Sequence, residues 1–238
     1  MSVALLFPGQ GSQAVGMGAG LAKAYPSARA LFEEVDAALS QNLSRVMWEG
    51  PESELTLTHN AQPAILAHSA AVLAVVGGRL EETALGAGHS LGEYSALVVS
   101  GVLGFRDALP LVRLRAQAMQ EAVPAGARAM AAILGLDDAA VRAACREAAQ
   151  GEVVEPVNFN APNQVVIAGH KSAVERGAAA AKAKGAKRAV MLPVSAPFHS
   201  SLLKPAADKL AAHLEKINLG APRIPVVNNV DVAQESDP

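Results

Sequence analysis

Cysteine and aromatic residues are scarce in this chain of 238 residues. Cys145 is the only cysteine, so no disulfide can form within the chain, and this favours a reducing compartment such as the cytoplasm. Aromatic residues make up only 3% of the chain, whereas alanine and glycine are abundant. This composition favours helices packed closely against sheets and argues against an all-β sandwich.

The sequence also lacks an excess of charge of one sign and a long apolar run. Lys and Arg number 20 against 22 Asp and Glu, and a formal net charge of -2 provides no general basic field for nucleic acid. No run reaches the roughly 18 apolar residues of a membrane-spanning helix. Met1–Phe7 lacks the basic start of a signal peptide, and Pro8 follows too soon. We expect a cytoplasmic monomer that binds neither nucleic acid nor membrane.

Short apolar runs alternate with helical patterns over the first half of the chain. Val3–Phe7 and Ala84–Ala87 are predicted strands, each followed by a loop that contains glycine. Predicted helices cover about 16–40, 62–78, 93–99 and 107–122. The last of them begins with Asp107 as its N-cap and has Pro110 in its first turn. This alternation predicts a parallel sheet with helices on its faces.

The pattern changes after Pro124-Ala125-Gly126, which we interpret as a domain boundary. Strands are predicted over 128–134, 153–158, 164–168 and 189–194, with helices over 137–150 and 172–184. This β-α-β-β-α-β order is that of a ferredoxin-like unit. A helix over 205–216 and a strand over 224–227 return to the first sheet. The predicted fold class is α/β, with a parallel-sheet, α/β-hydrolase-like domain formed by 1–125 and 197–238 and an inserted ferredoxin-like domain over 126–196.

The strongest local motif is a G-x-S-x-G pattern, Gly88–Gly92, between a predicted strand and the helix that follows it. In this context the pattern predicts a nucleophile elbow with Ser90 as the nucleophile. Glycines are needed on both sides because the serine occupies a strained turn with close neighbours. The hydroxyl then lies near a helix N-terminus, where the Leu91 N–H can stabilise developing negative charge. A glycine-serine turn without function is the alternative.

A serine hydroxyl is a poor nucleophile without a base, and the chain has six histidines. His199 lies in a loop between a predicted strand and helix, where catalytic side chains concentrate. His89, inside the elbow, is expected to point away from the hydroxyl of its neighbour. The remaining candidates are His59, His68, His170 and His213. Spacing alone does not decide which histidine meets Ser90.

Two further features are candidates for substrate binding. Arg115 is one of two arginines on an otherwise apolar helix, and its guanidinium suits a substrate carboxylate, although most helical arginines are solvated. The glycine-rich loop in Phe7–Gln13 permits close approach of the backbone to a ligand. Nucleotide binding there is a weak alternative, because the usual phosphate-binding glycine patterns are absent.

Taken together, these segments resemble the malonyl-CoA:acyl carrier protein transacylase family of fatty acid synthesis. The matching stretches, in family order, are Phe7–Gln13, Asn60–Pro63, Gly88–Tyr94, Arg115 with Met119–Pro124, Asn158–Asn160, Gln164–Gly169, Pro197–Ser200 and Val226–Asp231. The family normally continues through another strand and several helices, from which a backbone carbonyl orients the catalytic histidine. Because this chain stops at Pro238, we expect it to be C-terminally short relative to the family.

The resemblance implies that malonyl-CoA acylates Ser90 and that His199 acts as the base. The acyl group then passes to the phosphopantetheine thiol of acyl carrier protein. The backbone N–H groups of Gln10 and Leu91 would hold the oxyanion, and Arg115 would pair with the free carboxylate of malonate.

Other positions are implied to line the cleft or to meet the partner. Phe198 resembles a bulky residue that favours malonyl over methylmalonyl groups, and the remaining lining positions are Gln62, Asn160 and Gln164. The resemblance implies neither a metal nor a permanently bound cofactor. The basic residues that would meet an acidic carrier protein, or else form a solvated helix end, are Lys182, Lys184, Lys187 and Arg188.

Two alternatives to the transacylase stay open from the residues. A serine esterase or thioesterase of the α/β-hydrolase type needs an acid between its serine and histidine, and the candidates Asp137 and Asp138 fall in the small domain. A scaffold that binds carrier protein without turnover is the other. A malonyl adduct on Ser90 would exclude the scaffold, and hydrolysis that dominates over transfer would favour the thioesterase.

Overall fold

The computed structural model describes residues 3–77, 83–122, 126–193 and 196–237. They form two compact units, a first unit of Met1–Gln117 with Ala212–Pro238 and a second unit of Ala118–Ala211. These divisions fall within α7 (Phe105–Glu121) and α10 (Lys204–Leu214), rather than at the predicted 125/126 and 196/197. The sequence placed the boundaries at loops, whereas here a helix carries the chain across each of them.

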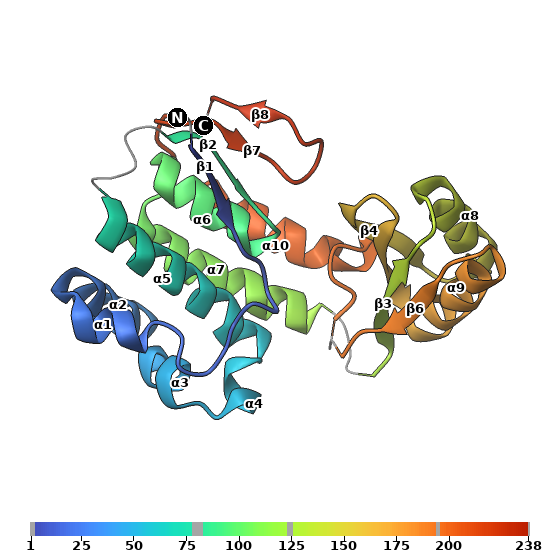
Figure 1. The fold of residues 1–238 in the computed structure, drawn as a ribbon, viewed down its shortest axis with the longest axis horizontal. Helices are drawn as coiled ribbons and strands as arrows, with labels where there is room; N and C mark the ends of the chain where they lie inside the picture. Colours follow the sequence, from blue (N-terminus) through green and yellow to red (C-terminus); the bar gives the residue numbers. More distant parts are fainter. Residues whose placement is uncertain (1–2, 78–82, 123–125, 194–195, 238) are drawn as a thin grey trace. The chain divides into compact units, whose positions relative to one another are not determined.

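The first unit contains a small sheet with the strand order β1-β2-β7-β8. Its strands are β1 (Val3–Phe7), β2 (Thr83–Gly88), β7 (Val226–Val227) and β8 (Gln234–Glu235). The first three strands are parallel, as predicted, and β8 returns antiparallel to β7. Phe7 pairs with Gly88, so the loops that follow β1 and β2 leave the same carboxyl edge of the sheet (Figure 1). This register places the glycine-rich loop next to the serine turn.

Helices make up most of the rest of the first unit. They are α1 (Ala19–Ala24), α2 (Pro26–Leu39), α3 (Leu43–Glu49), α4 (Glu52–Leu55), α5 (Thr58–Val76), α6 (Leu91–Ser100) and most of α7. The predicted helix over 16–40 is two helices, because Pro26 begins a new one. The predicted start of α7 was also wrong: the helix begins at Phe105, so Asp107 lies in its first turn and Pro110 inside it. Among the described residues, no helix is both long and apolar enough to cross a membrane.

The second unit has the predicted β-α-β-β-α-β order of elements. These are β3 (Arg128–Leu134), α8 (Asp138–Ala149), β4 (Val154–Ala161), β5 (Gln164–His170), α9 (Lys171–Ala183) and β6 (Arg188–Met191). The four strands are antiparallel in the order β4-β5-β3-β6. A 3₁₀ helix, η2 (Ser201–Leu203), and most of α10 complete the unit. Val194, the predicted end of the last strand, lies outside the described residues.

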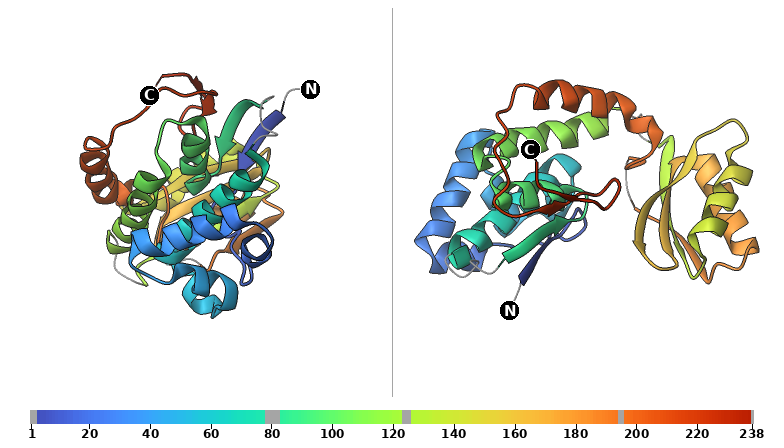
Figure 2. Two further views of the ribbon diagram at one scale, coloured as in Figure 1. Left: turned by 90° about the vertical axis from the view of Figure 1, so that its left-hand side faces the viewer. Right: turned by 90° about the horizontal axis from the view of Figure 1, so that it is seen from above.

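The two faces of the second sheet are buried differently. Ile133, Val165 and Ile167 face α8 and α9, which cover one side of the sheet (Figure 2). The helices contribute mostly alanines to this core, in agreement with the close helix–sheet packing expected from the composition. On the other face, Val166 and Ala168 pack with Phe198, from the segment that precedes η2. This segment also carries His199.

Candidate active site

Ser90 occupies a strained turn between β2 and α6. Its backbone has φ 52 and ψ -102, a positive φ that side-chain-bearing residues adopt only when the surroundings hold them there. A Cβ added to Gly88 would lie 1.9 Å from the carbonyl carbon of Gly92, and one added to Gly92 would lie 2.2 Å from the oxygen of Phe7. Only glycine fits at either position. This is the geometry that the sequence pattern predicts.

The loop after β1 packs against the same turn. The His89 N–H donates to the Phe7 carbonyl oxygen at 3.0 Å. A Cβ on Gly9 would lie 2.5 Å from the His89 carbonyl oxygen and 2.7 Å from its Nδ1. The His89 imidazole therefore packs over Gly9. The loop that carries Gln10 and the turn that carries Ser90 are held together by backbone contacts.

The Ser90 side chain does not cap the helix that it precedes, although a serine at an N-cap usually does. Its Oγ accepts a hydrogen bond from Nη2 of Arg115 at 3.0 Å. The hydroxyl is therefore directed toward a cation. Leu91 is the first residue of α6, and the N–H groups of a first helical turn have no acceptor within the helix. Leu91 itself is 1% exposed.

Arg115 is an unusual helical arginine because it is only 9% exposed. Its Nη1 donates to Oε1 of Gln62 at 2.7 Å. Gln62, itself 2% exposed, donates to Oε1 of Gln10 at 3.3 Å, and Gln10 donates to Oγ1 of Thr58 at 3.2 Å. A line of hydrogen bonds thus links the guanidinium to the loop after β1. The structure brings Ser90, Arg115, Gln62 and Gln10 together within the first unit.

The surroundings of Arg115 are aromatic and acidic. Its guanidinium lies 5.4 Å from the ring centroid of Tyr94, a cation–π distance. Burial lowers the pKa of Arg115, while the charges of Tyr94 and Glu93 act in the opposite direction. Burial likewise raises the pKa of Glu93 and of Tyr94, partly offset by Arg115. Because guanidinium stays protonated in proteins, the site contains a desolvated permanent cation.

Asn229, which is not among the site residues predicted from the sequence, contacts the serine turn directly. Its Oδ1 accepts from the Ser90 N–H at 2.6 Å, and its Nδ2 donates to the Gly88 carbonyl oxygen at 2.7 Å. Its own N–H donates to Oε2 of Glu93 at 3.2 Å. The segment Val226–Asp231 was recognised only as part of a family resemblance, and nothing in its spacing connected it with Ser90.

His199 lies in the second unit, on a turn of its own. It is exposed and has φ 66. The turn is held by Ser200, whose N–H and Oγ both bond to the Pro197 carbonyl oxygen at 3.1 and 2.8 Å. Ser201 follows with two bonds from its N–H and Oγ to the carboxylate of Glu155, at 2.7 and 2.8 Å. The predicted base thus stands on a turn that hydrogen bonds of Ser200 and Ser201 hold in place.

The remaining predicted positions also belong to the second unit. Phe198 is half-buried and packs against two apolar clusters, one of which includes Met119 and Leu203. Asn160 and Gln164 are exposed, beside the turn between β4 and β5. The predicted site residues therefore divide between the two units.

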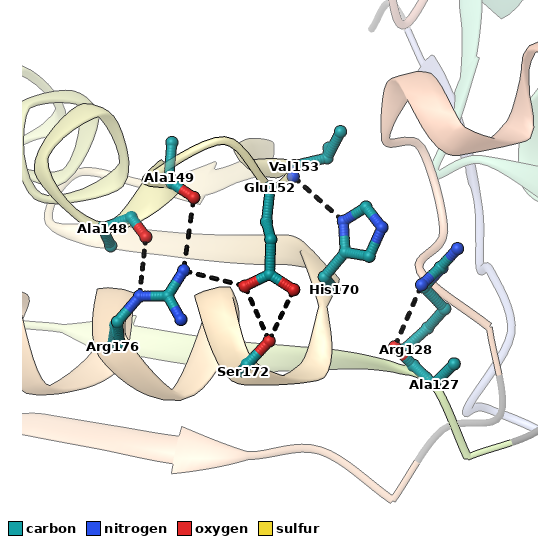
Figure 3. Close-up of polar contacts among 9 residues, drawn as sticks. All are labelled: Ala127, Arg128, Ala148, Ala149, Glu152, Val153, His170, Ser172 and Arg176. Atoms are coloured by element: carbon teal, nitrogen blue, oxygen red, sulfur yellow. Dashed lines mark hydrogen bonds and ion pairs between the residues drawn. The ribbon is translucent and has the colours of Figure 1, made fainter.

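The other titratable candidates have structural surroundings. Nδ1 of His170 accepts from the Val153 N–H at 2.9 Å, next to a cluster in which Glu152 binds Ser172 and Arg176 (Figure 3). Because that hydrogen bond uses the Nδ1 lone pair, His170 is a poor candidate for the base. Burial lowers the pKa of both His59 and His68, which lie on α5. Within the described residues, no group of three or more histidine, cysteine or acidic side chains is arranged to hold a metal ion.

The predicted basic cluster has partners inside its own unit. Lys184 forms an ion pair with Glu147 at 2.9 Å, and Lys182 donates to the Lys187 carbonyl oxygen at 3.5 Å. Both contacts lie within the second unit, and the docking of an acidic carrier protein on this cluster stays a prediction.

Comparison with known proteins gives consistent matches. A family model described as acyl transferase domain matches residues 4–238. The malonyl CoA-acyl carrier protein transacylase of Escherichia coli (strain K12) is 58% identical over 237 residues, which cover 98% of this chain and 76% of that protein. An acyl carrier protein S-malonyltransferase from Vibrio cholerae is 55% identical with a TM-score of 0.95, covering 98% of this chain and 77% of that one. A malonyl-transacylase solved in complex with a type II PKS acyl-carrier protein is 53% identical with a TM-score of 0.96, covering 100% and 77%.

Proposed function

The chain belongs to the acyl transferase domain family, and within it to the malonyl CoA-acyl carrier protein transacylases; on this premise we propose that Ser90 carries the malonyl group during transfer. The reaction moves a malonyl group from malonyl-CoA to acyl carrier protein in fatty acid synthesis. The observation that carries the proposal is the strained Ser90 turn, whose Oγ lies 3.0 Å from the buried guanidinium of Arg115.

A buried cation beside a nucleophile selects substrates that carry an anion close to the reacting carbon. Malonyl-CoA has a free carboxylate next to the carbon that bears its thioester carbonyl. Arg115, which is 9% exposed, pairs with this carboxylate by its planar fork. An acetyl group offers no anion and leaves the guanidinium without that partner, so acetyl-CoA is the poorer donor.

The proposed chemistry is a two-step exchange of acyl groups. Ser90 Oγ attacks the thioester carbonyl while His199 takes its proton, the C–S bond breaks, and His199 returns the proton to the leaving thiolate of coenzyme A. In the second step His199 takes the proton of the carrier thiol, whose sulfur attacks the malonyl-serine ester. The ester C–O bond then breaks, and the proton returns to Ser90 Oγ.

Both steps pass through a tetrahedral oxyanion, for which we propose two backbone donors. The Leu91 N–H lies at the N-terminus of α6, where the helix dipole is positive. The Gln10 N–H is the second, and the hydrogen bonds from its side chain to Thr58 and from Gln62 keep its loop in place. Preorganised donors of this kind stabilise the transition state without having to reorient.

The finer parts of the fold fit this proposal. The strand order β4-β5-β3-β6, with all neighbours antiparallel, is the order of a ferredoxin-like unit. The parallel strands β1, β2 and β7 with a serine turn after β2 resemble the α/β-hydrolase arrangement.

Phe198, fixed by its packing, is proposed to favour malonyl over methylmalonyl groups. Asn160 and Gln164 are proposed to line the same cleft. Acyl carrier protein is the transient partner, and we propose a monomer that acts in the cytoplasm without a bound cofactor.

The first test is intact-mass analysis after mixing the chain with malonyl-CoA. We expect a mass gain of one malonyl group that is absent in Ser90→Ala, whose thermal unfolding should match that of the unchanged chain. An adduct that survives in Ser90→Ala would place the nucleophile elsewhere. Supplying acyl carrier protein should transfer the group to its thiol, and release of free malonate in preference to transfer would indicate a thioesterase instead.

The second test compares two arginines on the same helix. Arg115→Ala should slow malonyl transfer by about 100-fold and spare acetyl transfer, because only malonate offers a carboxylate to this side chain. Arg113→Ala is the matched control, since Arg113 donates to Gln41 at 2.6 Å and no described contact joins it to Ser90. Initial rates with both donors measure the effect. Equal loss of malonyl and acetyl transfer in Arg115→Ala would make Arg115 a structural residue.

A further inference from the structure

Asn229 stands where the parallel pairing of β2 with β7 reaches the serine turn. Gly86 pairs with Val226 and Ala87 with Val227. Two residues further along the same register, Asn229 would stand opposite His89. In a parallel ladder, the main-chain N–H of a residue donates to the carbonyl of the residue before its partner. Its main-chain carbonyl accepts from the N–H of the residue after its partner. For Asn229 these groups are the Gly88 carbonyl and the Ser90 N–H.

The side chain of Asn229 makes these two bonds in place of its main chain. Nδ2 donates to the Gly88 carbonyl oxygen at 2.7 Å, and Oδ1 accepts from the Ser90 N–H at 2.6 Å. The main-chain N–H of Asn229 turns instead to Oε2 of Glu93 at 3.2 Å. An asparagine amide contains the same N–H and C=O groups as a peptide, so it can extend the ladder where the backbone departs from it.

These side-chain hydrogen bonds matter because without them the ladder between β2 and β7 would end at the strained residue, Ser90. A residue with φ 52 needs surroundings that over-determine its conformation. The glycine contacts fix Gly88 and Gly92, on either side of the turn. Asn229 fixes the two peptide groups that flank His89, and the second of these contains the Ser90 nitrogen. Since the Ser90 N–H is committed to Asn229, the oxyanion donors must come from elsewhere, in agreement with the proposed Gln10 and Leu91.

We propose that Asn229 is a positioning residue for acylation, which fixes the Ser90 backbone so that Oγ stays directed toward the substrate. The inference rests on the proposed role of Ser90 as the nucleophile. Asn229 acts through the turn and takes no part in proton transfer. It should therefore affect how often the hydroxyl is correctly oriented, and not how tightly the malonyl carboxylate is held by Arg115.

The test compares two adjacent asparagines in the same segment. Asn228 has its own side-chain bonds, to Oε1 of Glu235 at 2.8 Å and from the N–H groups of Val230 and Asp231 at 2.9 and 3.1 Å. Asn228→Ala therefore loosens this segment without removing a bond to the serine turn. Single-turnover formation of malonyl-Ser90 should slow by about 30-fold in Asn229→Ala, a loss on the order of two hydrogen bonds, and by less than about 3-fold in Asn228→Ala.

The substrate dependence of single-turnover acylation distinguishes positioning from loss of binding. In Asn229→Ala we expect the limiting acylation rate at saturating malonyl-CoA to fall while the half-saturating concentration stays within about 2-fold, because the carboxylate contact is untouched. A rise in the half-saturating concentration with an unchanged limiting acylation rate would overturn the proposal, as would equal slowing in Asn228→Ala and Asn229→Ala.

Amide hydrogen exchange tests the same inference without relying on activity. The Ser90 amide should exchange at least about tenfold faster in Asn229→Ala, while the Gly92 amide, which bonds to the His89 carbonyl oxygen at 2.9 Å, keeps its protection. Asn229→Asp retains an acceptor for the Ser90 N–H and should retain most of the protection. Unchanged Ser90 exchange in Asn229→Ala would overturn the proposal. If the unchanged chain forms no malonyl adduct, the role of Ser90 fails, and the exchange result still decides whether Asn229 holds the turn.

Discussion

Ser90 and His199 share a backbone feature, since both are non-glycine residues with positive φ, at 52 and 66. The two turns differ in what holds them. The Ser90 turn is enclosed by backbone contacts that leave no space for a Cβ at Gly88 or Gly92. At the other turn His199 is exposed between the buried residues Pro197 and Ser200. Hydrogen bonds from Ser200 to the Pro197 carbonyl oxygen and from Ser201 to the Glu155 carboxylate hold this turn.

The comparison shows two ways to stabilise a conformation that costs of order 1–3 kcal/mol. Close backbone packing, together with the two side-chain hydrogen bonds of Asn229, fixes the proposed nucleophile Ser90 within a rigid frame, where small shifts would misdirect the hydroxyl. Hydrogen bonds from Ser200 and Ser201 fix the turn of the proposed base, and His199 stays exposed, as a group that exchanges protons with substrates requires. Substitutions at Gly92, Glu155 and Cys145 test this difference between the two turns, and we expect their effects to decrease in that order.

Gly92→Ala should break the Ser90 turn. Its Cβ would lie 2.2 Å from the Phe7 oxygen, so the backbone must move, and we expect a loss of about 3 kcal/mol in the free energy of unfolding together with loss of acylation. Gly20→Ala is the matched control, because an added Cβ meets nothing within 4 Å in α1 and should stabilise by about 0.5–1 kcal/mol. Denaturant unfolding measures both. A Gly92→Ala chain as stable as the unchanged one would show that the two backbones are not in contact.

Glu155→Ala should loosen the His199 turn with a smaller effect. It removes the acceptor of two hydrogen bonds from Ser201, at 2.7 and 2.8 Å, and we expect malonyl-Ser90 formation to slow by about 10-fold while the first unit stays intact. Glu152→Ala is the control, because that carboxylate binds Ser172 and Arg176 at a different place in the same unit (Figure 3). If both variants slow acylation equally, the Glu155 contact has no specific effect on His199.

Cys145→Ala should have the smallest effect, because Cys145 lies on neither turn. It tests whether the thiol contributes to acylation. Burial is the largest of the effects that raise the pKa of the Cys145 thiol to about 11, so only about one molecule in 3,000 carries the thiolate at pH 7.5. We expect acylation within about 2-fold of the unchanged chain and very slow labelling of the native protein by iodoacetamide. The labelling should increase as pH rises toward 11. Rapid labelling at neutral pH would show that the thiol is more accessible than its place in α8 indicates.

The sequence predicts the Ser90 turn well because the signal is local. Gly88, Ser90 and Gly92 lie within five residues, and their role follows from backbone sterics alone. The order of strands and helices in the second unit was also predictable, since each element has its own periodicity. Local patterns were less reliable at boundaries: Asp107 reads as an N-cap, yet α7 begins two residues earlier, at Phe105.

Contacts between distant segments could not be predicted in this way. Asn229 reaches Ser90 across 139 positions, and Gln10 reaches Gln62 across 52. Both pairings depend on strand register and helix packing, which composition and spacing do not encode. The burial of Arg115 belongs to the same class, because a helical arginine is usually solvated and only the packed helix shows otherwise.

The close main-chain contacts at Gly88 and Gly92 also limit how this chain can change in evolution. A Cβ on Gly177 would meet Cδ1 of Ile167 at 3.0 Å, so trimming that side chain with Ile167→Val could act as a second-site suppressor of Gly177→Ala. At Gly88 and Gly92 the atoms in the way belong to the main chain, and no codon offers a smaller peptide group. Substitutions there have no single compensating partner, and the residues around the proposed nucleophile must be inherited as a set.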